Sequence, residues 1–199
     1  MSSGRPLKIV VIGDGMVGKT CLLMTYVRKA FPEQYIPTVF ENYSGSVHVG
    51  GEEVAFELWD TAGQEEYSHL RPLTYSNVDV IILCFSLIRQ PSFDNVESKW
   101  LKEIRDSGDL KNKPFILVGT MSDYRAETSK LGIAPVISHD KGRRLAKSIG
   151  AVGYLECSAK LNSGVKEVFN MAIQCGLDNR VSKPKKHRYQ AKLGLAVLI

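Results

Sequence analysis

The chain of 199 residues is 44% hydrophobic and 24% charged, which is enough apolar material for one domain with a complete core. Residues 180–199 hold six of the 26 basic residues and none of the 21 acidic ones, so the net charge of +5 belongs to the tail and the remainder is nearly neutral. Tyr189 is the single aromatic residue among the lysines of that tail, so no aromatic platform for stacking nucleic-acid bases is expected. No stretch approaches the roughly 20 apolar residues of a membrane helix.

The cysteines and the first residues indicate where the protein works. The four cysteines stand far apart and form no C-x-x-C pair, which favours a reduced, cytoplasmic protein. The first six residues lack the apolar stretch of a secretory signal. We therefore expect an N-terminal extension over residues 1–6, one folded domain over residues 7–177, and a disordered tail over residues 178–199 that is first basic and then apolar.

Strand and helix patterns alternate from the start of the domain. Residues 8–12 are apolar on both faces, which predicts a strand covered by helices on both sides, and a helix pattern follows Lys19. Residues 31–40 contain two prolines and no periodic pattern, so they predict a loop. Residues 43–49 and 53–60 are joined by a pair of glycines, which predicts an antiparallel hairpin.

The alternation continues to the end of the domain. The predicted elements are a strand at 78–87, a helix at 92–107 capped by Ser92, a strand at 114–120, a helix at 138–149 ended by Gly150, a strand at 152–156, and a helix at 163–175 ended by Gly176. This order predicts an α/β domain with a doubly wound, mostly parallel six-stranded sheet, one antiparallel edge strand and helices on both faces. Ligands of such sheets bind at the carboxyl ends of the strands.

A phosphate-binding motif lies at one of these ends. The segment GDGMVGKT, residues 13–20, follows the first strand and opens the first helix; we call it the phosphate loop. Its backbone N–H groups and the helix dipole favour phosphate, Lys19 can reach the outer phosphates, and the Thr20 hydroxyl can ligate Mg²⁺. The predicted ligand is a nucleoside triphosphate.

A second motif follows the hairpin. Asp60 ends its strand, where a carboxylate can hold Mg²⁺ through water, and the N–H of Gly63 can meet the γ-phosphate. Gln64 is then placed to orient the water that attacks the γ-phosphate. These roles predict hydrolysis of the triphosphate.

Two further motifs address the base. GTMSD, residues 119–123, and ECSAK, residues 156–160, follow the fifth and sixth predicted strands. Asp123 can accept hydrogen bonds from the two adjacent N–H donors of guanine, and backbone N–H groups of the second motif can bind the guanine carbonyl. Their co-occurrence favours guanine over adenine. It argues against an ATP-using kinase, and no lid for a phosphate acceptor is evident.

Together with YIPTVFENY at residues 35–43 and WDTAGQEEYSHLRPLTY at residues 59–75, these motifs resemble small GTPases of the Rho family, within the Ras superfamily, over roughly residues 7–177. The resemblance implies the P-loop NTPase fold of small G proteins. It also implies a monomeric molecular switch that binds GTP with Mg²⁺, hydrolyses it slowly to GDP, and acts in actin cytoskeleton, polarity or vesicle signalling. The two switch loops are residues 31–40 and 63–75.

The resemblance also implies roles for individual residues. Thr38 joins Thr20 as a direct Mg²⁺ ligand and, with Lys19 and Gln64, forms the expected catalytic set. The expected nucleotide-binding residues are Asp14, Gly15, Met16, Val17, Gly18, Lys19, Thr20, Cys21, Phe31, Tyr35, Thr38, Asp60, Gly63, Thr120, Met121, Asp123, Ser158, Ala159 and Lys160. The expected effector-binding residues are Tyr35, Pro37, Thr38, Val39, Phe40, Glu41, Asn42 and Tyr43.

Three classes of partner follow from the resemblance: effectors that read the switch loops, exchange factors that open the site, and GTPase-activating proteins that supply an arginine. The first switch loop contains no arginine of its own. A partner's arginine is therefore expected to accelerate hydrolysis, by about 10³- to 10⁵-fold in related GTPases.

One departure from the family concerns the base pocket. Met121 stands where small GTPases usually have lysine. Methionine keeps the apolar cover of the base but loses a polar bond, so nucleotide retention is expected to weaken by up to about 1 to 1.5 kcal/mol. This leaves an alternative: a fast-exchanging, mostly GTP-bound interaction module whose hydrolysis is functionally minor. A second departure is residues 124–133, which are shorter than the charged insert of Rho proteins and contain a glycine.

The tail is the third departure. No cysteine follows Cys175, so a C-a-a-X prenylation box and the family's usual lipid anchor are not expected. The basic residues within 183–188 can attract anionic lipid at about 1 kcal/mol per charge near the surface, which predicts at most a weak, salt-sensitive peripheral contact with the cytoplasmic face of a membrane. The alternatives are a solvated tail, an apolar end that dips into the membrane interface, or capture of that end by a partner's groove.

Overall fold

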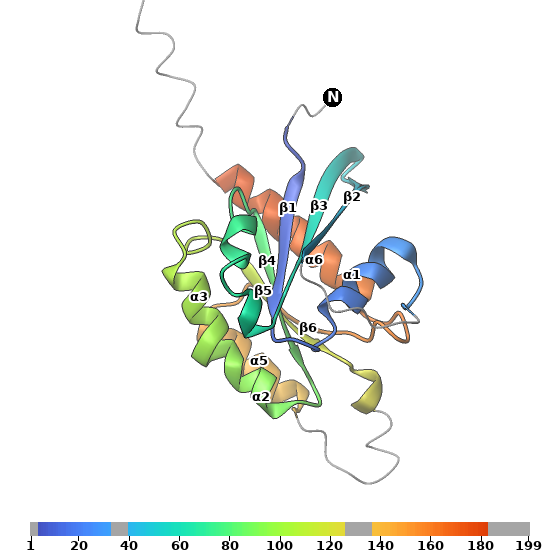
Figure 1. Ribbon diagram of the computed structural model, residues 1–199. Coiled ribbons are helices and arrows are strands. Elements are labelled where there is room, and N and C mark those ends of the chain that lie inside the picture. Colours follow the sequence, from blue (N-terminus) through green and yellow to red (C-terminus); the bar gives the residue numbers. More distant parts are fainter. Residues whose placement is uncertain (1–3, 33–39, 126–136, 183–199) are drawn as a thin grey trace, which may run out of the picture.

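The computed structural model describes residues 4–32, 40–125 and 137–182 (Figure 1). Within these ranges, six strands form one sheet in the order β2-β3-β1-β4-β5-β6, with only the β2–β3 pair antiparallel. The strands are β1 Leu7–Gly13, β2 Phe40–Val49, β3 Glu52–Thr61, β4 Val80–Ser86, β5 Phe115–Thr120 and β6 Tyr154–Glu156. The predicted fold class is confirmed.

β1 lies inside the sheet and is buried along its whole length. Ile9 lies opposite Leu58 of β3 on one side and Val80 of β4 on the other, and all three side chains are fully buried. A strand apolar on both faces is stable only where helices cover both faces, which is the position that β1 takes.

The predicted hairpin joins β2 to β3. Gly50 and Gly51 have φ angles of 59° and 86°. Two successive positive φ angles give the hairpin turn whose twist matches that of the flanking strands, and glycine adopts them without steric cost. Val47 and Val54 are cross-strand partners and pack against the buried core. The prediction of this edge hairpin is confirmed.

Helices cover both faces of the sheet (Figure 1). α1 Lys19–Arg28 and α6 Val165–Ser182 lie on one face, where the ring of Tyr26 stacks on that of Phe169 with centroids 3.9 Å apart. α2 Gln90–Asn95, α3 Leu101–Asp106 and α5 His139–Ile149 lie on the other, over a second core. α5 begins with the Ser138 cap and ends at Gly150, as predicted.

The helix predicted at residues 92–107 starts earlier than expected, and Ser92 does not cap it. It begins with α2 at Gln90 and places Pro91 in its first turn, where the missing proline N–H costs nothing. The Ser92 hydroxyl is buried inside the turn, 2.8 Å from the Arg89 carbonyl oxygen and 3.0 Å from the Ser86 nitrogen. A π turn, Val96–Trp100, joins α2 to α3.

The sequence predicts that the last helix ends at Gly176. This prediction is wrong, because α6 continues to Ser182. Gly176 packs against β1, because a β-carbon at this position would lie only 2.9 Å from Leu7 Cδ1. The glycine therefore allows close packing of α6 on the strand and does not terminate the helix. The expected division of the chain at residues 7 and 177 stays a prediction.

A buried carboxylate ties both flanks of the domain to the sheet. Asp79, just before β4, accepts two hydrogen bonds of 2.7 Å from Arg5, one of 2.6 Å from Arg180 and one of 2.9 Å from the Lys8 amide. We call Arg5, Asp79 and Arg180 the terminal clasp. Burial alone would raise the pKa of the Asp79 carboxyl, but the bonds from Arg180, Arg5 and the Lys8 amide hold this pKa below its usual value.

Two predictions about the whole chain can also be compared with the described ranges. The four cysteines are all free thiols, and the reduced, cytoplasmic setting stays a prediction. Among the described residues, no helix is both long and apolar enough to cross a bilayer.

Candidate functional site

The phosphate loop connects the carboxyl end of β1 to the start of α1, as predicted. Lys19 is the first residue of α1, and its side chain folds back across the loop, where Nζ donates to the carbonyl oxygens of Gly13 and Asp14 at 2.8 Å each. Burial lowers the pKa of the Lys19 ammonium, and the nearby Asp60 carboxylate opposes this. The loop therefore presents backbone groups and one buried ammonium to the same space.

Asp60 lies next to the helix that the phosphate loop opens. The Thr20 hydroxyl donates to Asp60 Oδ2 at 2.6 Å, and Asp60 is completely buried at the carboxyl end of β3. The two oxygen-bearing residues are 40 positions apart in the chain, yet the parallel pairing of β1 with β3 brings them into contact. Their juxtaposition was predicted from the two motifs.

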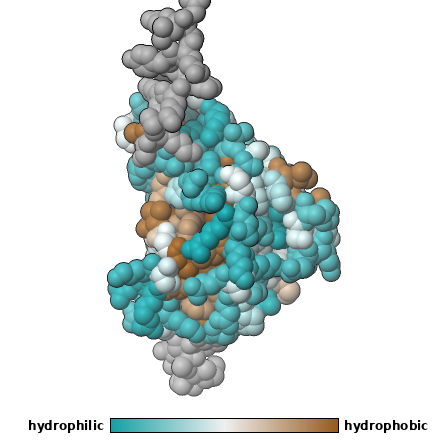
Figure 2. All heavy atoms as spheres, turned by 90° about the vertical axis from the view of Figure 1, so that its left-hand side faces the viewer, coloured by the Kyte–Doolittle hydropathy of each residue, from teal (hydrophilic) through white to brown (hydrophobic). Residues whose placement is uncertain are grey.

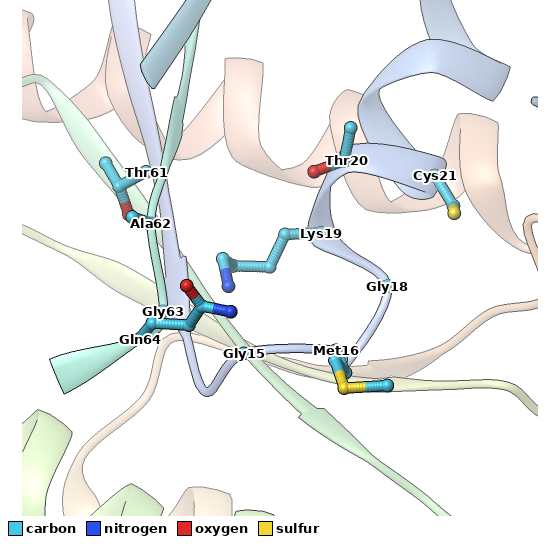
Figure 3. Close-up of a pocket in the computed structure, with 10 residues that line it drawn as sticks. All are labelled: Gly15, Met16, Gly18, Lys19, Thr20, Cys21, Thr61, Ala62, Gly63 and Gln64. Atoms are coloured by element: carbon cyan, nitrogen blue, oxygen red, sulfur yellow. The ribbon is translucent and has the colours of Figure 1, made fainter. Parts of the chain in front are cut away.

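Gly63 and Gln64 lie directly on the phosphate loop (Figure 3). A β-carbon on Gly63 would lie 2.3–2.4 Å from backbone atoms of residues 13–15, so only glycine allows the two segments to approach this closely. A β-carbon on Gly15 would lie 3.2 Å from Gln64 Cγ. The side chains of Gln64 and Lys19 extend toward each other from opposite walls of one pocket, whose other lining residues are Gly15, Met16, Gly18, Thr20, Cys21, Thr61, Ala62 and Gly63.

A second pocket of about 180 Å³ adjoins the first and shares Gly18 and Cys21 with it. Its walls are mostly apolar, with the carboxylate of Asp123 and the ammonium of Lys160 as its charged groups. The remaining lining residues are Leu22, Phe31, Thr120, Met121, Tyr124, Cys157 and Ala159. An apolar slot with one carboxylate can hold a flat base that offers N–H donors.

The predicted base contacts take distinct positions around this pocket. The Thr120 hydroxyl lies 2.6 Å from the carbonyl oxygen of Val17, so it ties the end of β5 to the phosphate loop. The Met121 sulfur accepts a hydrogen bond from the Ser86 hydroxyl at 3.3 Å. Ser158 is fully buried behind the pocket and its N–H donates to the Ser163 carbonyl at 2.8 Å, whereas Ala159 and Lys160 face the pocket.

Comparison with known protein families agrees with this geometry. The sequence profile of the Ras family matches residues 8–177. The chain belongs to the Ras family. Proteins of the Ras family are small GTPases that bind GTP and GDP, generally with Mg²⁺, and that interact with regulators and effectors. We call the first pocket, which the phosphate loop lines, the phosphate side, and the second, which residues of the GTMSD and ECSAK motifs line, the base side.

The residues on the phosphate side fit the Mg²⁺ that Ras-family proteins generally use. Thr20 and Asp60 offer hard oxygen donors 2.6 Å apart. Among the described residues, no group of three or more His, Cys, Asp or Glu side chains could form an all-protein metal cage. A small number of protein ligands is typical of a Mg²⁺ site, because Mg²⁺ keeps several of its waters and is otherwise bound by phosphate oxygens.

Part of the predicted site lies outside the described residues. This holds for Tyr35, Pro37, Thr38 and Val39 and for the side chain of Phe40. The predicted effector residues that are described lie on β2, the edge strand, where Glu41 and Asn42 are exposed and Tyr43 is half-buried. Burial and the bond to Glu41 raise the pKa of the Tyr43 hydroxyl to about 12. The basic cluster of the tail also lies outside the described residues.

Asp14 is placed differently from its neighbours in this Ras-family loop. Its Oδ1 accepts from Trp100 Nε1 and its Oδ2 from Asn95 Nδ2, both at 2.7 Å. The Asp14 side chain therefore binds α2 and the π turn, and its backbone carbonyl holds Lys19. Sequence reasoning missed Asn95 and Trp100, because neither spacing nor any motif connects residues more than 80 positions apart.

Proposed function

We propose that the chain is a Rho-like small GTPase that binds GTP with Mg²⁺, hydrolyses it slowly and signals through its switch loops. The observation that carries this is the placement of Gln64 against Gly15 and across from Lys19 in one pocket. In this proposal Lys19 binds the outer phosphates, Thr20 and Thr38 bind Mg²⁺, and Asp60 holds Mg²⁺ through water. Gln64 orients the attacking water.

The same geometry explains how hydrolysis changes a binding surface. Gly63 and Gln64 open the second switch loop while packed on the phosphate loop, so the presence or loss of the γ-phosphate acts directly on that segment. Figure 2, which faces the side of the molecule where α3 lies, shows apolar surface framed by hydrophilic side chains. Within the second switch loop Leu73 is 76% exposed. Because this side chain belongs to a segment that would respond to the γ-phosphate, we assign it to the surface that effectors, exchange factors and GTPase-activating proteins bind.

The assignment to the Rho subgroup rests on the sequence of the phosphate loop and of residues 35–43 and 59–75. Residues 40–43 of the first of these two segments lie on the edge strand β2, which would present them to effectors.

The proposed function can be tested on the purified chain. Nucleotide released from the purified, denatured chain is identified by chromatography, and single-turnover GTP hydrolysis is compared between the parent and Gln64→Leu. We expect guanine nucleotide and at least about tenfold slower hydrolysis in Gln64→Leu. Adenine nucleotide, or equal rates, would overturn the proposal.

Met121 supports a second candidate, a fast-exchanging module that is mostly GTP-bound. Its side chain lines the base pocket and offers only a thioether where an ammonium would form stronger hydrogen bonds. The two candidates differ in what the purified chain contains and does. Bound GTP together with rapid GDP release favours the module, whereas bound GDP and slow release favour the hydrolysing switch.

A further inference from the structure

A buried arginine holds the backbone at Gln64. Arg71 is only 3% exposed, and its Nη1 lies 3.3 Å from the carbonyl oxygens of both Ala62 and Gln64. The Gln64 carbonyl also accepts from the Tyr67 N–H at 3.3 Å, so Arg71 adds a contact from further along the second switch loop. The guanidinium therefore fixes the segment from which the Gln64 side chain projects.

Arg71 is in turn fixed from α3. Its Nε and Nη2 donate to the two carboxylate oxygens of Glu103 at 2.9 and 2.7 Å, and the Tyr75 hydroxyl donates to the same carboxylate. Burial alone would raise the pKa of Glu103, but the bonds from Arg71 and Tyr75 hold it below its usual value. Such a two-pronged pairing fixes the orientation of the guanidinium as well as its position.

The same helix holds the opposite wall of the phosphate pocket. Trp100, at the end of the π turn, donates to Asp14 of the phosphate loop, and the Arg71 guanidinium lies 4.8 Å from the centre of the Trp100 ring. Asn95, just before the π turn, binds the second oxygen of Asp14. One continuous helical segment thus contacts both the loop that holds the phosphates and the arginine that holds the Gln64 backbone.

We propose that Arg71 and Glu103 are positioning residues for hydrolysis, and that they act by holding Gln64 at a fixed distance from the phosphate loop. This rests on the proposed GTPase function. Neither side chain lines the phosphate pocket among the described residues, so both act through Gln64. A glutamine that must orient a water is sensitive to its backbone position, because a misplacement of about 1 Å can reduce a rate by up to about a hundredfold.

The first experiment measures single-turnover GTP hydrolysis and GTP dissociation for the full chain. Glu103→Gln removes the charge that fixes Arg71, and Arg71→Lys removes the paired N–H groups that reach Glu103 and the carbonyls. We expect both variants to hydrolyse GTP at least about tenfold more slowly and to release GTP within about twofold of the parent rate. Glu97→Gln, the same chemical change at an exposed position in the π turn, is the matched control and should behave as the parent.

The second experiment asks whether the effect passes through Gln64. Glu103→Gln is combined with Gln64→Leu; residues that act as one unit are not additive, so the double variant should hydrolyse GTP no more slowly than Gln64→Leu alone. A full additional loss in the double variant would overturn the inference, as would parent-like hydrolysis in both single variants. A parent that hydrolyses GTP no faster than Gln64→Leu would instead overturn the proposed function itself.

A spectroscopic measurement separates positioning from damage to the fold. The chain has two tryptophans, so an amide NMR spectrum shows two indole N–H resonances, and Trp59→Phe leaves that of Trp100. Because this N–H donates to Asp14, its resonance reports the anchor of the phosphate loop. We expect it to remain in Glu103→Gln, with at most a small shift caused by the changed position of the Arg71 guanidinium over the ring. A lost or strongly shifted resonance would assign the slower hydrolysis to the phosphate loop and overturn the inference.

Discussion

Replacing Met121 by lysine tests how strongly this chain holds its nucleotide. Met121 lines the base pocket, and its terminal methyl lies 3.7 Å from where a β-carbon on Gly18 would be, so the side chain covers the phosphate loop beside the base site. Its polar contact is the weak bond from the Ser86 hydroxyl to sulfur at 3.3 Å. Lysine has a stem of similar length and adds an ammonium that can donate to neighbouring oxygens.

The expected gain follows from the exchange of contacts. The apolar cover is kept, the thioether contact is lost, and one hydrogen bond to a charged donor is added, for a net gain of about 1 to 1.5 kcal/mol in the nucleotide-bound state. This corresponds to roughly tenfold slower GDP release. The same pocket holds the carboxylate of Asp123 and the ammonium of Lys160, which act on the new ammonium with opposite signs.

The assay follows release of a fluorescent GDP analogue from the full chain into excess unlabelled GDP, with Mg²⁺ present. Met121→Leu is the matched control, because it keeps the apolar cover without adding a donor; its release rate should lie within about twofold of the parent. Equal release rates for the parent and Met121→Lys would refute the reasoning. If Met121→Leu were as slow as Met121→Lys, packing would be the cause, and the missing polar bond would not.

Three further predictions concern other positions. In Gly15→Val the added methyl groups displace the Gln64 side chain, because even a β-carbon would lie 3.2 Å from Gln64 Cγ; GTP hydrolysis should fall at least about tenfold with GTP still bound, and unimpaired turnover would contradict our placement of the site. Asp79→Asn should lower the free energy of unfolding by about 3 kcal/mol in urea titrations at pH 7, because it removes a buried charge from two arginines. Because the pKa of Asp79 is held low, the parent should lose this contribution only below about pH 4, and an equal acid-induced loss in the variant would argue against the clasp. Gly176→Leu should lower that free energy by about 1 to 3 kcal/mol through overpacking against Leu7, whereas Gly108→Ala, in open space, should be nearly neutral in the same titration.

The sequence predicted the parts of the site that rest on contiguous motifs. A glycine-rich turn between a strand and a helix has few possible geometries, so the positions of Lys19 and Thr20 followed from their order in the chain. The positions of Asp60 and Asp123 at the same edge of the sheet were predictable because parallel strands bring their carboxyl ends together there. The contact of Gln64 with Gly15 needed only that the two motifs meet at that edge.

Contacts between distant side chains had no such signal. Arg71 and Glu103 are separated by 32 positions, and each alone is typical of a solvated surface; only the packing of α3 against the second switch loop makes them a buried pair. The predictions of two helix boundaries were wrong for a related reason. Serine often begins a helix and glycine often ends one. Here the Ser92 hydroxyl bonds to the Arg89 carbonyl within a turn, and Gly176 permits close packing of α6 on β1.

The terminal clasp holds the two described ends of the chain side by side. Arg5 and Arg180 lie outside the segment that matches the Ras family, residues 8–177, and both grip one aspartate where β4 begins. β1 runs about 20 Å from that region to the phosphate loop, so the described ends of the chain lie at the pole opposite the phosphate loop (Figure 1). A surface or partner that holds either described end therefore receives the other beside it, while the phosphate loop lies at the far end of β1.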